Sequence, residues 1–180
     1  MTLGTVTEPV ARAWYEETFN CKVIERGIAV HKWNKWVGSS VDGEIVEQDG
    51  QPANDGIIEI KCPQGRYDKL FEHQARLAAG EVFDRYYHAH IKNDHYDQMI
   101  GNMAVMGKKF CDYIVYCTAT REIYVERVWF NQKYWEEDLY PALQHFIEVH
   151  LKPLVKQPPV MPLQYYVRES PDEATSCRDL

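Results

Sequence analysis

The feature that most constrains the fold is residues 56–62, which read G-I-I-E-I-K-C. Their β-branched residues and their alternation of apolar and charged side chains predict a strand. Successive side chains of a strand point to opposite faces, so Ile58 and Ile60 would face a core while Glu59 and Lys61 share the other face. The pattern therefore predicts a sheet that presents an acid and an amine side by side.

A second acid lies upstream, where Asp42-Gly43 interrupts an apolar stretch over residues 36–46. This stretch is typical of a partner strand bent at Asp42-Gly43, and the polar residues 47–55 would form the hairpin connection. Antiparallel pairing would bring Asp42 beside Glu59. Two adjacent carboxylates are costly without a cation between them, and Mg²⁺ takes oxygen ligands. The pattern thus predicts a divalent-metal site made of two carboxylates and a backbone carbonyl.

Lys61 would add a fixed positive charge beside that ion, as a metal-dependent nuclease needs at a phosphodiester. A surface hairpin with solvated charges is the structural alternative, because Asp-Gly is also a common turn signal. The combination of Asp-Gly, an apolar strand and Glu-x-Lys on its polar face favours the nuclease site.

The surrounding residues resemble the phage lambda exonuclease and YqaJ-like viral recombinase family of the PD-(D/E)XK nuclease superfamily. Residues 38–43 read G-S-S-V-D-G and residues 58–63 read I-E-I-K-C-P, similar to the family's S-P-D-G and E-[LI]-K-C-P motifs. Val41 stands where the family often has proline. The similarity spans most of residues 4 to about 155. It implies an α/β (α+β) PD-(D/E)XK restriction-endonuclease-like core, with a central mixed sheet flanked by helices.

Two more residues follow from the resemblance. Glu8 matches a helix that supplies an additional active-site glutamate, and Gln98, in Y-D-Q-M, matches a segment whose glutamine lies in the active site. The resemblance implies that the catalytic residues are Lys61, Glu59, Asp42, Gln98 and Glu8.

The implied cofactor is Mg²⁺, for which Mn²⁺ would substitute. Its ligands would be Asp42, Glu59 and the Ile60 carbonyl, with Glu8 serving a second ion or its water shell. Lys61 would orient the attacking water and Gln98 would help to position it.

The resemblance implies a phage-type recombination exonuclease that acts 5′ to 3′ on linear duplex DNA. Two alternatives stay open: a structure-specific or single-strand nuclease on the same core, or a nuclease-like subunit that binds DNA or a recombinase with little cleavage. Intact Asp42, Glu59 and Lys61 count against the subunit. The implied partners are DNA and a single-strand annealing recombinase, in a trimer or a monomer. The implied location is the cytoplasm of a bacterial host, with a phage or prophage as the source.

Longer family members carry an additional N-terminal region in which an I-T-A-S-like segment grips the 5′ phosphate. The sequence begins just before the Glu8 helix without such a segment. We therefore expect only a weak dependence on a 5′ phosphate, unless another element takes over that role.

The net charge of −7 favours at most a narrow DNA track, because DNA binding draws on basic residues. The candidate DNA-binding residues are Arg12, Lys32, Lys35 and Arg66. No apolar run reaches membrane-spanning length, and no basic-then-apolar segment suggests a signal peptide. Five cysteines in no framework spacing fit reduced thiols.

The expected organisation is one nuclease domain over residues 1–156 and a proline-containing tail or strap over 157–180. Helices are expected over four stretches and strands over several more, with hairpin and cap signals between them. The helices are 9–19, 66–80, 94–106 and 132–154; the further strands are 21–28, 29–37, 111–118 and 122–130.

His88, His90 and His95 suggest a zinc cluster at first sight. Their spacing is loose and no cysteine or acid completes the ligand set in the sequence, so we expect solvated imidazoles or a loop near the DNA path instead.

Overall fold

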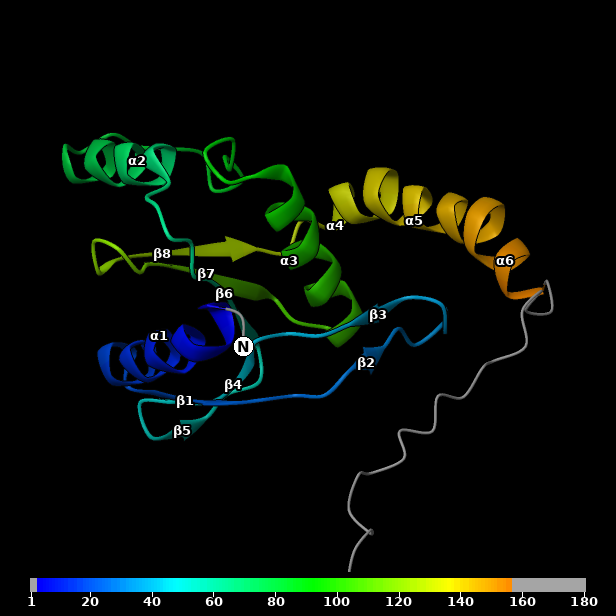
Figure 1. The fold of residues 1–180 in the computed structure, drawn as a ribbon, viewed down its shortest axis with the longest axis horizontal. Helices are drawn as coiled ribbons and strands as arrows, with labels where there is room; N and C mark the ends of the chain where they lie inside the picture. Colours follow the sequence, from blue (N-terminus) through cyan, green and yellow to red (C-terminus); the bar gives the residue numbers. More distant parts are fainter. Residues whose placement is uncertain (1–2, 157–180) are drawn as a thin grey trace, which may run out of the picture.

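A six-stranded mixed sheet lies at the centre of the protein (Figure 1). In the computed structural model, which describes residues 3–156, its strand order is β1-β4-β6-β7-β8, with β5 paired to β4. Among the described strands only β6 and β7 pair in parallel, and the chain crosses between them through α2 and α3. The strands are β1 Cys21–Ile24, β4 Gly43–Gln48, β5 Gln51–Pro52, β6 Gly56–Lys61, β7 Phe110–Cys117 and β8 Glu122–Trp129.

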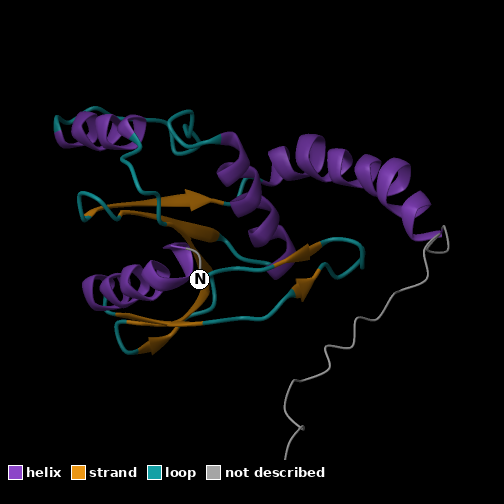
Figure 2. Ribbon diagram, viewed as in Figure 1, coloured by secondary structure: helices purple, strands orange, loops and turns teal. Residues whose placement is uncertain are grey.

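Helices flank this sheet, as expected (Figure 2). The first three are α1 Leu3–Phe19, α2 Asp68–Ala78 and α3 Asn93–Met106. A long helical stretch follows β8; it comprises α4 Gln132–Tyr134, α5 Tyr140–Phe146 and α6 Lys152–Lys156, joined by the wide π turns Trp135–Leu139 and Ile147–Leu151. A small second sheet, β2 Ala29–Val30 with β3 Gly38–Ser39, lies beside α3.

The two faces of the large sheet have separate cores. Ala11 and Tyr15 of α1 pack on Ile45, Ile58 and Ile114. The opposite face, which includes Ile57, Tyr113 and Tyr124, is covered by α2, α3 and the start of the C-terminal helical stretch. Because side chains alternate along each strand, every position of β6, β7 and β8 belongs to one layer or the other. For residues 57–60 this confirms the alternation expected from the sequence.

Several expected boundaries were wrong. Helix α1 begins at Leu3 and continues through Pro9, whose missing N–H costs one hydrogen bond while burial of Ala11 and Tyr15 holds the helix on the sheet. Strand β1 ends at Ile24, which pairs with Glu44. Its antiparallel partner β4 begins at Gly43, one residue before Glu44, so β1 has almost no partner beyond Ile24.

The bent strand expected over residues 36–46 is two strands, β3 and β4, separated by residues 40–42. The expected hairpin connection contains β5. A tight turn at Asp49 and Gly50 precedes β5, with positive φ angles of 52° and 75°. Both values fit a two-residue hairpin turn.

Other expectations were confirmed. Helix α3 ends at Gly107, which has a φ of 66°, and the β7–β8 hairpin turns at Arg121, with a φ of 60°. The expected tail over residues 157–180 lies outside the described residues. Within residues 3–156, no helix is both long enough and apolar enough to cross a membrane.

Candidate active site

The pairing of β4 with β6 brings the two predicted acids together. Gly43 pairs with Ile58 in antiparallel register, so the next position outward on each strand is Asp42 opposite Glu59. Asp42 Oδ2 accepts a hydrogen bond of 2.6 Å from the Ile60 N–H. The N–H and C=O groups of a strand residue point to the same side, so the Ile60 carbonyl is directed toward Asp42. This confirms the predicted placement of Asp42.

Glu59 and Lys61 lie on the face covered by α3. The Lys61 Nζ is 2.6 Å from Glu59 Oε1 and donates to Gln98 Oε1 at 2.9 Å. Glu59 is only 1% exposed, which excludes the alternative of a solvated surface hairpin. The structure therefore brings Gln98 and the Glu-x-Lys pair into direct contact.

Helix α1 supplies the other side of the site. Glu8 and Arg12 line a pocket together with Asp42 and Ile60. One guanidinium nitrogen of Arg12 donates to the Asp42 carbonyl at 3.4 Å, and another lies 2.5 Å from a Glu25 oxygen. Glu8 and Arg12, four residues apart on α1, therefore place a carboxylate and a guanidinium cation beside Asp42.

The three acids influence one another electrostatically. Burial, followed by the charge of Asp42, raises the pKa of Glu59 to about 7. Burial and Asp42 also raise the pKa of Glu8. Burial raises the pKa of Asp42 in spite of the Ile60 N–H, Lys61 and Arg12, which act in the opposite direction. Each acid is thus harder to ionise than an isolated one.

This donor set fits a divalent cation with oxygen ligands. Glu8, Asp42 and Glu59 provide carboxylates, and the Ile60 carbonyl points toward the same space. Burial raises the pKa of all three acids, and the charge of Asp42 adds to the rise at Glu8 and Glu59. A bound cation relieves that repulsion, and Mg²⁺ accepts such a set while keeping several waters.

One residue of the site, Asn102, escaped sequence reasoning. Asn102 is buried and donates to Glu59 Oε2 at 3.3 Å, and its own side-chain oxygen accepts from Ser39 Oγ at 2.8 Å. Asn102 lies one turn after Gln98 on α3, on the same helix face. That spacing of four residues is the signal that would have found it.

The candidate DNA-binding residues do not gather around the pocket. Only Arg12 lines it. Lys32 and Lys35 lie in the loop between β2 and β3, where the Lys32 Nζ sits 4.9 Å from the centre of the Trp33 ring. Arg66 forms an ion pair of 3.2 Å with Glu122.

The expectation for the histidines was wrong in one respect. An acid does accompany them, because Glu126 of β8 contacts both His88 and His90. His95 is elsewhere: its Nδ1 lies 2.6 Å from the Tyr113 hydroxyl. The acid was invisible in the sequence because it lies 36 residues beyond His90 and reaches it only through the packing of β8.

Comparisons with known proteins agree with this architecture. The model of the YqaJ-like viral recombinase domain matches residues 1–109. The crystal structure of an alkaline exonuclease from Laribacter hongkongensis is similar, with a TM-score of 0.54 and 24% identity over 84% of this chain and 72% of that chain. The same exonuclease in complex with dAMP gives the same values. No curated protein sequence matches the chain. The structural likeness shows that the fold is that of this exonuclease, as the sequence predicted.

Proposed function

The chain belongs to the YqaJ-like viral recombinase family, and on that premise we propose that it is a Mg²⁺-dependent exonuclease that digests linear duplex DNA from its 5′ ends during recombination. The observation that carries the proposal is the contact of Lys61 with both Glu59 and Gln98, beside Asp42. The solved structure to which the chain is similar is named an alkaline exonuclease, which supports exonuclease chemistry. A single-strand annealing recombinase would be the protein partner.

The residues divide the work between binding and positioning. Asp42, Glu59 and the Ile60 carbonyl would hold the cation, with Glu8 across the pocket. When bound, the cation lowers the pKa of a water molecule and balances charge that develops on the phosphodiester.

Lys61 is the proposed catalytic cation of the protein itself. Lys61 would orient a water for attack and stabilise negative charge on the phosphate, with Glu59 serving as a ligand of the cation. Gln98 accepts from Nζ, so it fixes the direction in which the ammonium points. Arg12, at the mouth of the pocket, would contact the DNA backbone.

The test is digestion of a linear duplex, labelled at either the 5′ or the 3′ end, by the full chain in Mg²⁺. Wild type should release the 5′ label first as mononucleotide, and Ca²⁺ should not replace Mg²⁺. Lys61→Ala should cut the rate roughly a hundred- to a thousandfold. Lys133→Ala, which removes an exposed lysine remote in sequence from the site, is the matched control and should leave the rate unchanged.

Each alternative gives a different result in this assay. A single-strand or structure-specific nuclease would prefer single-stranded or branched DNA, and a binding subunit would shift DNA in a gel without cutting it. A Lys61→Ala variant as active as wild type would overturn the assignment of the site.

A further inference from the structure

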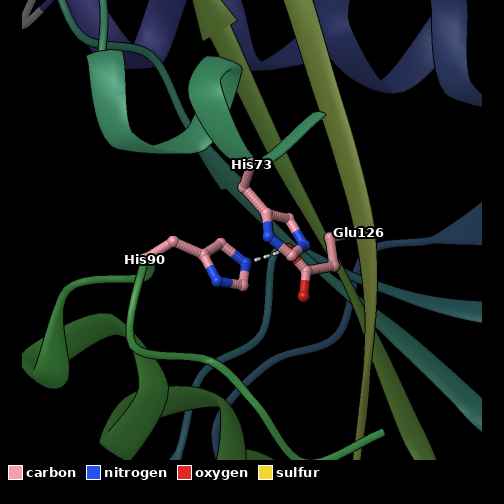
Figure 3. Close-up of side chains that lie close together, drawn as sticks. All are labelled: His73, His90 and Glu126. Carbon is pink, nitrogen blue, oxygen red and sulfur yellow. Dashed lines mark hydrogen bonds and ion pairs between the residues drawn. The ribbon is translucent and has the colours of Figure 1, made fainter. Parts of the chain in front are cut away.

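A second cluster of metal-ligand side chains lies on the same face of the sheet as Glu59. Its members are His73 from α2, His90 from the loop between α2 and α3, and Glu126 from β8 (Figure 3). One potential ligand atom from each residue lies within 4.8 Å of the other two. The three residues come from three separate elements, so only the folded chain assembles them.

The histidines of this cluster have unused ring nitrogens. His73 is only 5% exposed, and its Nδ1 has no hydrogen-bond partner within residues 3–156. The Nδ1 of His90 and the Nε2 of His88 are likewise buried, and no described residue bonds to them. Buried polar atoms are ordinarily paired, so the described residues do not satisfy all the nitrogens of these rings.

The carboxylate of the cluster is already oriented. Glu126 Oε1 lies 3.0 Å from His88 Nδ1, and Oε2 lies 2.5 Å from His90 Nε2. Oε2 also accepts from the Tyr124 hydroxyl. These contacts hold both oxygens of Glu126 in fixed directions.

The cluster combines two imidazoles with one carboxylate. Zinc binding would require both imidazoles to be neutral, because only a neutral ring has the lone pair that binds a metal.

We propose that His73, His90 and Glu126 form a Zn²⁺ site, separate from the Mg²⁺ site at Asp42 and Glu59. Two imidazoles and one carboxylate, with an open fourth position, are a common zinc ligand set, whereas Mg²⁺ prefers oxygen ligands. His88 contacts Glu126 Oε1, the oxygen that would not bind the ion, and would keep the carboxylate in position.

The geometry allows the ligands to close around one ion. Bonds of about 2.0–2.1 Å in a tetrahedron place ligand atoms about 3.3 Å apart. His90 Nε2 and Glu126 Oε2, which are 2.5 Å apart, would separate slightly, and all three ligand atoms already lie within 4.8 Å of one another. The rings of His73 and His90 are now stacked, 3.6 Å apart and within 10° of parallel. Rotation about the histidine Cβ–Cγ bonds, which have broad torsional minima, would turn both lone pairs toward a common point. A surface pocket lined by His73, His90 and Arg76 gives the ion an entry path.

The ion would tie α2 and the loop over residues 79–92 to β8. Glu126 pairs with Tyr113, and Tyr113 pairs with Glu59, so the two metal sites are two strands apart, about 10 Å by ordinary strand spacing. The zinc site would therefore brace the wall of the active site without taking part in the chemistry.

The test is calorimetric titration of ZnCl₂ into the untagged, metal-free full chain in excess Mg²⁺, which occupies the carboxylate site. Wild type should bind one Zn²⁺ per chain, and Zn²⁺ should raise its melting temperature. His73→Gln and His90→Gln should each weaken binding at least roughly tenfold. His145→Gln, which removes an exposed histidine on α5, is the matched control and should bind like wild type.

Three results would overturn the proposal: no stoichiometric binding by wild type, unchanged affinity in His73→Gln, or loss of binding in His145→Gln. If His73→Gln fails to fold, the visible spectrum of wild type loaded with Co²⁺ decides. Intense bands of tetrahedral cobalt support the site, and the weak bands of octahedral cobalt exclude it. None of these measurements depends on nuclease activity, so the zinc site and the proposed function can fail separately.

Discussion

Glu59, which is buried, and Glu126, which is partly buried, lie in one row across the sheet and are joined through Tyr113, yet their pKa values are shifted in opposite directions. The pKa of Glu59 is raised to about 7 and that of Glu126 is lowered to about 2. Burial raises both. The neighbours decide the outcome: Glu59 faces the charges of Asp42 and Glu8, whereas Glu126 accepts hydrogen bonds from His88, His90 and Tyr124.

This difference in pKa indicates which kind of metal ion each glutamate favours. The site at Glu59 brings this buried acid together with the carboxylates of Asp42 and Glu8, so it favours a strongly charged cation with oxygen ligands. Glu126 is stabilised as a carboxylate by neighbouring groups, and it stands among imidazoles that favour a softer ion. The two glutamates lie in the same row of the sheet. Their preferences for different ions come from residues of other elements that contact each glutamate.

The largest expected effect comes from removing the repulsion at Glu59. Asp42→Asn should reduce DNA cleavage roughly a hundred- to a thousandfold, because a proposed metal ligand loses its charge. It should also lower the pKa of Glu59, measurable by carboxyl-carbon NMR titration. Asp49→Asn at the exposed β4–β5 turn is the control, since asparagine tolerates the positive φ found there. A Glu59 pKa that stays the same in Asp42→Asn would contradict the account of this site.

Acid should destabilise the protein through Glu126. Its folded pKa of about 2 lies below the ordinary value of 4.5, so its stabilisation is complete above pH 4.5 and is lost as the pH falls toward 2. At about 1.4 kcal/mol for each pKa unit, the loss is on the order of 3 kcal/mol. Urea unfolding of wild type and Glu126→Gln at several acidic pH values measures it.

The variant should lose that part of the pH dependence. Glu122→Gln, in the same strand but with a side chain that is 40% exposed, should retain it. Identical acid profiles for wild type and Glu126→Gln would refute the proposed role of the three hydrogen bonds.

The pH dependence due to Glu59 should have the opposite sign. Between pH 4.5 and about 7 the folded chain keeps a proton that the unfolded chain has released, so stability falls as pH rises through this window. Mg²⁺ favours the ionised carboxylate and should reduce that fall. Unfolding midpoints at pH 5 and pH 8, with and without Mg²⁺, provide the measurement. A fall of the same size with and without the ion would argue against metal binding at Glu59.

A smaller effect is expected at Asn102, a positioning residue that acts through Glu59. Asn102→Ala removes the donor to Glu59 and should cost about 1–2 kcal/mol of stability. It should also reduce the rate constant of cleavage about tenfold, leaving KM for DNA unchanged. Ser39→Ala is the matched variant, because it removes the bond to Asn102 but keeps the bond from Asn102 to Glu59. Equal rates for the two variants would show that the Glu59 bond has no part in positioning.

The smallest effect is expected far from both glutamates, at Arg66. Its ion pair with Glu122 is solvent-exposed, so Arg66→Ala should change stability by less than about 1 kcal/mol. If Arg66 contacts DNA, affinity should weaken uniformly across sequences and the salt dependence of binding should become shallower. Filter binding at several salt concentrations separates this from Arg12→Ala, which should give the larger loss because Arg12 lines the pocket.

The sequence by itself determined the features that depend on neighbouring residues. Alternation in residues 56–61 predicted β6 and the shared face of Glu59 and Lys61, because the two-residue period of a strand leaves no other arrangement. Gly107 predicted the end of α3, because glycine adopts the left-handed conformation at little cost. Glu8 and Gln98 were identified through resemblance, since neither residue carries a local signal of its own.

Only the tertiary structure decided the features that depend on distant segments. Asn102 reaches Glu59 because α3 packs on β6 and β7, and Glu126 meets His73 and His90 because β8 lies beneath α2 and the loop that follows it. Strand boundaries such as the end of β1 at Ile24 were likewise set by where the partner strand begins. The acidity of each glutamate belongs to the same class, because burial and the charges of distant residues are properties of the folded chain and not of any segment alone.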